Sequence, residues 1–167
     1  MDNNKQADRP KVERIDGRLH FVHHVRDAQG NIIKTVTGPL KVEVRLEDCG
    51  QLLAGACVMA LPVALTGEVW DLGEALSPAR TLAILILSLL TLAAFVWALF
   101  YGRRVREYPG HFCKRVLSAY LITFLVAFLL LFLFDKAPLD DLGTTFIRTI
   151  IVAFPSAFAA TVVDFVK

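Results

Sequence analysis

The last of four long apolar stretches, residues 142–165, places the strongest constraint on how this chain can fold. It contains about 24 residues, which as a helix would rise ~36 Å. That length is enough to cross a bilayer core of ~30 Å. Its only charged residues are Arg148 and Asp164. A stretch of this length and composition is typical of a membrane-spanning helix.

One face of this expected helix carries small or weakly polar side chains. At 100° per residue, that face contains Thr145, Thr149, Ala153, Ser156, Ala160 and Asp164. Small residues let one membrane helix approach another closely. We therefore expect Thr145, Thr149, Ser156 and Asp164 to lie either on a packing face or along a pathway through the membrane.

Three further apolar stretches, residues 51–72, 79–101 and 112–134, are each about 20 residues or longer and carry few charges. Ser77 and Pro78 precede the second stretch and are a favourable N-cap and first-turn pair. Neither the second nor the third stretch shows the polar face that a helix of a soluble protein would have. The sequence thus predicts an all-α membrane protein, a four-helix transmembrane bundle over residues 49–167.

The N-terminal part of the chain has a different pattern. Residues 1–13 are polar and are expected to be a disordered tail. Residues 14–48 contain three runs of β-forming residues, separated by turn residues at 27–30 and 38–39. These runs, at 18–26, 31–37 and 40–46, predict a small β-meander. Because so small a sheet cannot hold a core alone, it is expected to pack on the bundle or on a neighbouring subunit.

The charges of the loops predict how the chain is oriented in the membrane. Between the second and third stretches, one acidic residue accompanies a cluster of basic ones: Arg103, Arg104, Arg106, Lys114 and Arg115. The other two loops are mainly acidic. Since Lys and Arg accumulate on the cytoplasmic side, both termini and the β-segment are expected in the cytoplasm. The net charge of only +2 argues against a nucleic-acid partner.

Arg148 is costly inside a membrane and needs a partner. Small residues of the first and fourth stretches could meet in antiparallel helices, which would bring Glu68 and Asp71 level with Arg148. We therefore expect an intramembrane charge cluster of Glu68, Asp71 and Arg148. It could be a salt bridge that fixes helix register, or a gate at the mouth of a pathway.

Motifs for catalysis or cofactor binding are absent from the sequence. There is no Ser/His/Asp or Cys/His set, no HExxH and no glycine-rich phosphate loop, so an enzyme and a cofactor are not expected. His20 and His24 would share a strand face but lie ~13 Å apart, and His23 would point the other way. A metal site is therefore not expected, while a pH-responsive role of these histidines stays open.

Several segments resemble a known family. They are residues 53–73 (LAGACVMALPVALTGEVWDLG), with Thr66, Glu68, Trp70 and Gly73 as their core, then Ser77-Pro78, and then residues 153–164 (AFPSAFAATVVD). Over the four apolar stretches the chain is similar to bacterial integral membrane proteins of unknown function. The resemblance implies a bacterial inner-membrane setting and supplies no activity.

Two functional hypotheses follow. The first is a small channel or transporter, which would have to be a homo-oligomer because four helices enclose little space. The alternative is a non-transporting membrane anchor or sensor whose cytoplasmic β-segment binds a protein partner. In both, the lipid bilayer surrounds the helices.

Overall fold

The computed structural model describes residues 11–15, 18–26, 29, 31–39, 46–102 and 109–166. The chain divides into two compact units, Met1–Glu43 and Val44–Lys167.

The N-terminal unit contains an antiparallel sheet with the strand order β1-β2-β3. The strands are β1 (Lys11–Ile15), β2 (Arg18–Arg26) and β3 (Ile32–Pro39), with an irregularity in the pairing at Val25/Arg26. In the central strand Val22 is buried, and His24 Nδ1 lies 3.1 Å from Thr35 Oγ1 on β3. Apolar side chains of β3 remain exposed, so the sheet encloses little core.

The predicted meander is not supported in the form in which it was predicted. Strands occur near 18–26 and 31–37, but the remaining strand is β1, in a segment predicted to belong partly to a disordered tail. The strand predicted at 40–46 falls mainly outside the described residues, and Leu46 instead begins a helix. Alternation of apolar and polar residues is a local signal, and it does not determine which runs pair.

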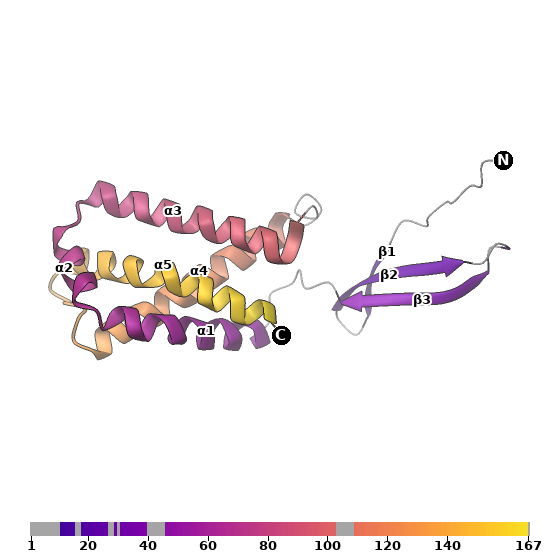
Figure 1. Ribbon diagram of the computed structural model, residues 1–167, viewed down its shortest axis with the longest axis horizontal. Coiled ribbons are helices and arrows are strands. Elements are labelled where there is room, and N and C mark those ends of the chain that lie inside the picture. Colours follow the sequence, from indigo (N-terminus) through magenta and orange to yellow (C-terminus); the bar gives the residue numbers. More distant parts are fainter. Residues whose placement is uncertain are drawn as a thin grey trace. The chain divides into compact units, whose positions relative to one another are not determined.

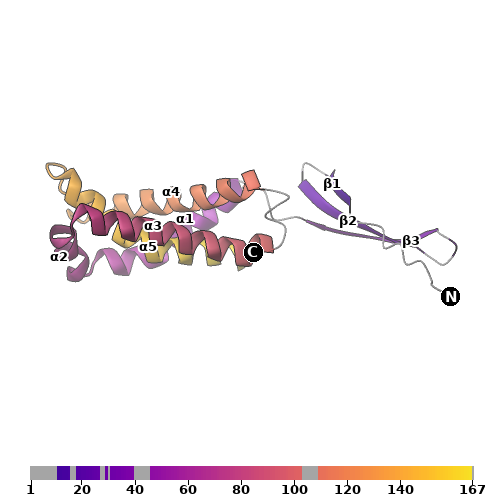
Figure 2. The ribbon, with the colours of Figure 1, turned by 90° about the horizontal axis from the view of Figure 1, so that it is seen from above.

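The second unit is helical. Its elements are α1 (Leu46–Ala64), α2 (Gly67–Ala75), α3 (Pro78–Val96), one turn of π-helix, η1 (Trp97–Tyr101), α4 (Pro109–Leu133) and α5 (Leu142–Val166). Figures 1 and 2 show α1, α3, α4 and α5 side by side, with α2 crossing one end of the bundle. Helix α5 contacts all four other α-helices and is the most buried of the long ones.

Small residues let α1 and α5 approach closely. Ala56, Ala60 and Ala64 of α1 are fully buried, as are Ala153, Ser156 and Ala160 of α5. A Cβ atom at Gly55 would lie 2.6 Å from the Cα of Ala160, so only glycine fits at this contact. The antiparallel contact follows from the small-residue faces that the sequence shows.

Among the described residues, three helices are long and apolar enough to cross a membrane: α3 with η1, α4 and α5. The first predicted span, residues 51–72, is not one continuous helix. Helices α1 and α2 meet at an angle of 80°, and together they could form a fourth, broken span. Large apolar side chains cover the outside of the long helices, among them Leu90, Leu121 and Leu125.

Candidate functional site

The chain turns sharply between α1 and α2, and hydrogen bonds hold the turn. Thr66 donates to the carbonyl oxygen of Val63 through both its hydroxyl (2.7 Å) and its backbone N–H (3.1 Å). The indole Nε1 of Trp70 donates to the carbonyl oxygen of Ala64 at 3.0 Å. This carbonyl belongs to the last turn of α1, where no intrahelical donor is left. Trp70 therefore serves as a C-terminal cap for α1.

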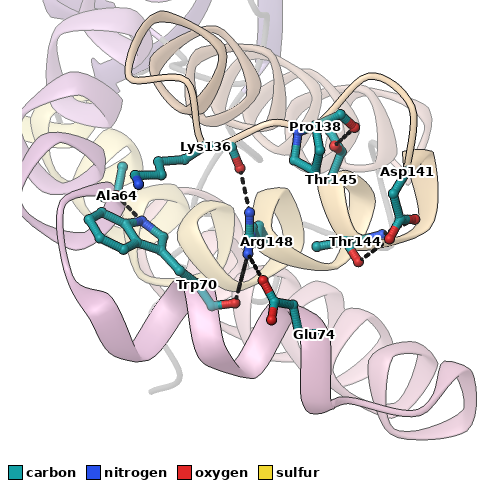
Figure 3. A network of polar contacts seen from close by, with 9 residues as sticks. All are labelled: Ala64, Trp70, Glu74, Lys136, Pro138, Asp141, Thr144, Thr145 and Arg148. Carbon is teal, nitrogen blue, oxygen red and sulfur yellow. Dashed lines mark hydrogen bonds and ion pairs between the residues drawn. The ribbon is translucent and has the colours of Figure 1, made fainter.

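The side chain of Arg148 extends from α5 toward α2, and the residue is only 7% exposed. Its Nη2 donates to the Trp70 carbonyl oxygen at 3.0 Å and to Glu74 Oε1 at 2.8 Å, and its Nη1 donates to the Lys136 carbonyl oxygen at 2.9 Å (Figure 3). The guanidinium thus joins three segments: α2, α5 and the loop before α5. Two of its three acceptors are backbone carbonyls.

Glycine at position 73 makes this approach of α2 and α5 possible. A Cβ atom there would lie within 3.0 Å of three side-chain atoms of Arg148. The aliphatic stem of Arg148 therefore packs directly on the backbone of α2. A larger residue at this position would displace the Arg148 side chain from its place against α2.

The end of α4 positions the Lys136 carbonyl. Asp135 has φ 57°, a left-handed conformation, its N–H donates to Phe132 O, and the Lys136 N–H donates to Leu131 O. This is the Schellman arrangement that ends many helices, with Asp in the place that glycine usually takes. The ammonium of Lys136 also lies 4.0 Å from the centre of the Trp70 ring, a cation–π contact. The loop is thus tied to α2 through Trp70 and to α5 through Arg148.

The start of α5 is capped by Asp141. Its Oδ1 accepts from the Thr144 N–H at 3.1 Å, and its Oδ2 accepts from the Thr144 hydroxyl at 2.6 Å (Figure 3). These bonds, first of all the one from the hydroxyl, hold the pKa of the Asp141 carboxyl below its ordinary value of 3.8. The hydroxyl of the following residue, Thr145, donates to Pro138 O at 2.7 Å.

A second arginine is buried at the other end of the bundle. Arg115 of α4 is 3% exposed, and its Nη1 lies 2.5 Å from Asp164 Oδ2 on α5. Its Nη2 lies 3.5 Å from Asp48 Oδ2 on α1, and its guanidinium carbon is 4.2 Å from the centre of the Phe100 ring. Arg115 therefore connects α1, η1, α4 and α5.

The bundle, the apolar exterior and the paired buried arginines fit an integral membrane protein. The family described as "Putative integral membrane protein (DUF2391)" matches residues 23–164. The chain belongs to this family. Thus the resemblance noted in the sequence is confirmed, and the match also reaches into β2 and β3, beyond the four apolar stretches. No curated protein and no solved structure matches the chain.

In this member of DUF2391, the acidic partner of Arg148 differs from the expected one. Glu68 and Asp71 are both exposed, and within the described part of the chain neither forms an ion pair; Glu74 does. The prediction treated residues 51–72 as one continuous helix. Because the chain bends after Ala64, α2 has its own helical phase and turns Trp70, Gly73 and Glu74 toward Arg148. Pro62 and Gly67 are the sequence signals that could have revealed a break.

The other predicted site residues lie inside the bundle. Thr145, Thr149, Ser156 and Asp164 are all buried on α5. The hydroxyls of Thr149 and Ser156 each donate to the carbonyl oxygen four residues earlier, at 2.7 Å.

The burial of Arg115 was not predicted from the sequence, because a basic residue beside an Arg-rich loop has the pattern of a surface charge. Among the residues that the structure describes, no three His, Cys, Asp or Glu side chains gather as metal ligands would.

Proposed function

We propose that this protein is a non-transporting membrane module whose N-terminal sheet binds a protein partner. The observation that carries the proposal is that the buried hydroxyls and arginines of the bundle already have hydrogen-bond or ion-pair partners within it. The buried hydroxyls of Thr145, Thr149, Ser156 and Thr161 donate to backbone carbonyls, and both buried arginines are ion-paired. Polar groups that are already satisfied within the bundle are poor ligands for a passing ion or solute.

The proposed setting is a bacterial inner membrane with both termini in the cytoplasm. Support comes from the basic residues between the second and third apolar stretches and from the acidic character of the other two loops. With this orientation α2, Arg148 and the loop before α5 lie on the outer side. The N-terminal unit then lies in the cytoplasm, where a protein partner is available to it.

The partner surface proposed here is β3. It is at the edge of the sheet, and its side chains Ile32, Ile33 and Val36 are 52%, 67% and 44% exposed. An exposed edge strand with apolar side chains can add a strand from another chain. The proposal includes no catalytic activity, because the sequence offers no set of residues for it.

One observation favours transport by a homo-oligomer as a second candidate. The central helix α5 carries an ionic contact near each end, Arg148–Glu74 and Asp164–Arg115. Ion pairs at both ends of a central helix could open and close alternately, as access changes in a transporter do. In that case the two arginines would be gate residues rather than helix connectors.

Flux measurements separate the two candidates. Purified full-length protein in liposomes should release K⁺, Na⁺ and H⁺ no faster than protein-free liposomes do. A protein-dependent flux that is lost in both Arg148→Met and Arg115→Met variants, with folding retained, would replace our proposal by the transport candidate.

Photo-crosslinking tests the proposed binding of a protein partner to β3. A photo-crosslinking residue at Ile33 should capture a protein in cells, and the same residue at Leu139 should not capture it.

A further inference from the structure

Helices α3 and α5 leave a crevice between them near the end of the bundle that carries α2. Its volume is about 210 Å³. The walls are formed by the first turns of the two helices, among them Pro78, Thr81, Leu85, Phe146, Ile147 and Ile150. Figures 1 and 2 show α3 beside α5, and α3 is the least buried of the long helices. The crevice is thus a gap at a loosely packed helix pair.

Water is a poor occupant of this crevice. A buried water needs two to four polar partners, and the walls present none. The one polar side chain among those named, Thr81, uses its hydroxyl to donate to the carbonyl oxygen of Ser77 at 3.1 Å. The Thr81 side chain therefore turns its methyl group to the crevice.

A further helix is too large to fill the crevice. One turn of a helix with its side chains occupies roughly 400 Å³ or more, given a diameter of ~10–12 Å and a pitch of ~5.4 Å. An apolar cavity of ~150 Å³ is enough to take up benzene. A space of about 210 Å³ therefore has room for a short hydrocarbon segment.

The mouth of the crevice continues the apolar outer surface of the helices. Leu82 and Phe146 line it and are 56% and 48% exposed. In a membrane protein such a surface faces lipid chains. We propose that the crevice between α3 and α5 is a binding site for one acyl chain of a membrane phospholipid. The chain fills the space down to Ile150, which lies ~10 Å along α5 from its first turn.

The test uses the full chain in liposomes of 1-palmitoyl-2-oleoyl-phosphatidylcholine, transferred to detergent and examined by native mass spectrometry. The wild type should retain one phospholipid per chain after most lipid is removed. Leu85→Phe and Leu82→Trp fill the crevice from α3, and each should lower retention roughly tenfold, the effect of losing contacts to about two methylene groups. Leu90→Trp, a control at a 64% exposed position outside the crevice, should retain the lipid.

Leu82→Ala widens the crevice at an exposed position and should fold. It should keep the bound lipid. The proposal is overturned if the wild type retains no lipid, or if the filling variants retain as much as Leu90→Trp.

Discussion

The guanidinium of Arg148 and the carboxylate of Glu74 form an ion pair at 2.8 Å that joins α5 to α2. The two partners differ in environment: the side chain of Arg148 is 8% exposed and that of Glu74 is 73% exposed. Solvent screens an ion pair with so exposed a partner. The contacts of Arg148 to backbone carbonyls should therefore matter more for stability than its ion pair does.

Substitutions at Arg148 and Glu74 test this difference. Glu74→Gln should lower the free energy of unfolding by less than ~1 kcal/mol, because the exposed ion pair is weak. Arg148→Met should lower it by ~2–4 kcal/mol, because the Trp70 and Lys136 carbonyls lose their donor. Unfolding by SDS in mild detergent micelles measures both. Glu68→Gln is the matched control and should have no effect; equal losses at positions 74 and 148 would contradict the argument.

A methyl group at Gly73 should displace the Arg148 side chain from its place against α2. Gly73→Ala places a Cβ atom against the stem of Arg148 and should cost ~1–3 kcal/mol through overpacking. Gly67→Ala in the same helix meets no atom within 4 Å and should be neutral or stabilise by up to ~1 kcal/mol. The same unfolding assay compares the two variants. Similar free energies of unfolding for both would show that Arg148 does not pack closely against Gly73.

The second buried ion pair should be more sensitive to loss of one partner. Because Arg115 and Asp164 are both buried, Asp164→Leu leaves the arginine with only the longer contact to Asp48 and should cost up to ~3–5 kcal/mol. The double variant Arg115→Met/Asp164→Leu should cost less than the two single variants added together. Asp48→Asn, at the 3.5 Å contact, should have a smaller effect. Additive losses would show that Arg115 and Asp164 are not coupled.

The cap of α5 makes stability depend on pH. The pKa of Asp141 is lowered in the folded protein, so its contribution is present above the ordinary value of 3.8 and is lost as the pH falls through the lower, folded value. The variant Asp141→Asn keeps a side chain that can cap α5 but has no carboxyl group that titrates. The difference in stability between wild type and this variant should therefore shrink below about pH 4; a difference that stays constant across this pH range would contradict the argument.

Labelling of single cysteines tests the proposed orientation. Cys49, Cys57 and Cys113 are first replaced by serine. A cysteine at Leu139, which is 59% exposed, should react with an impermeant thiol reagent added outside, and one at Tyr108 should not. The reverse pattern of labelling would place both termini outside.

The sequence alone determined the features that depend on local composition and period. The length of the second, third and fourth apolar stretches predicted α3, α4 and α5, and the 100° spacing identified the buried small-residue face of α5. Alternation indicated strands in the N-terminal part, although not their final arrangement. These signals are local because helix and strand periods repeat within a few residues.

Only the tertiary structure decided the partners of the charged residues. Glu74 rather than Glu68 or Asp71 meets Arg148 because α1 and α2 meet at 80°, and Gly73 lets the arginine approach. Arg115 is buried because the ends of α1, η1 and α5 converge on it. A charge is identified by its residue type, but its partner depends on the angle between helices, which a one-dimensional pattern does not contain.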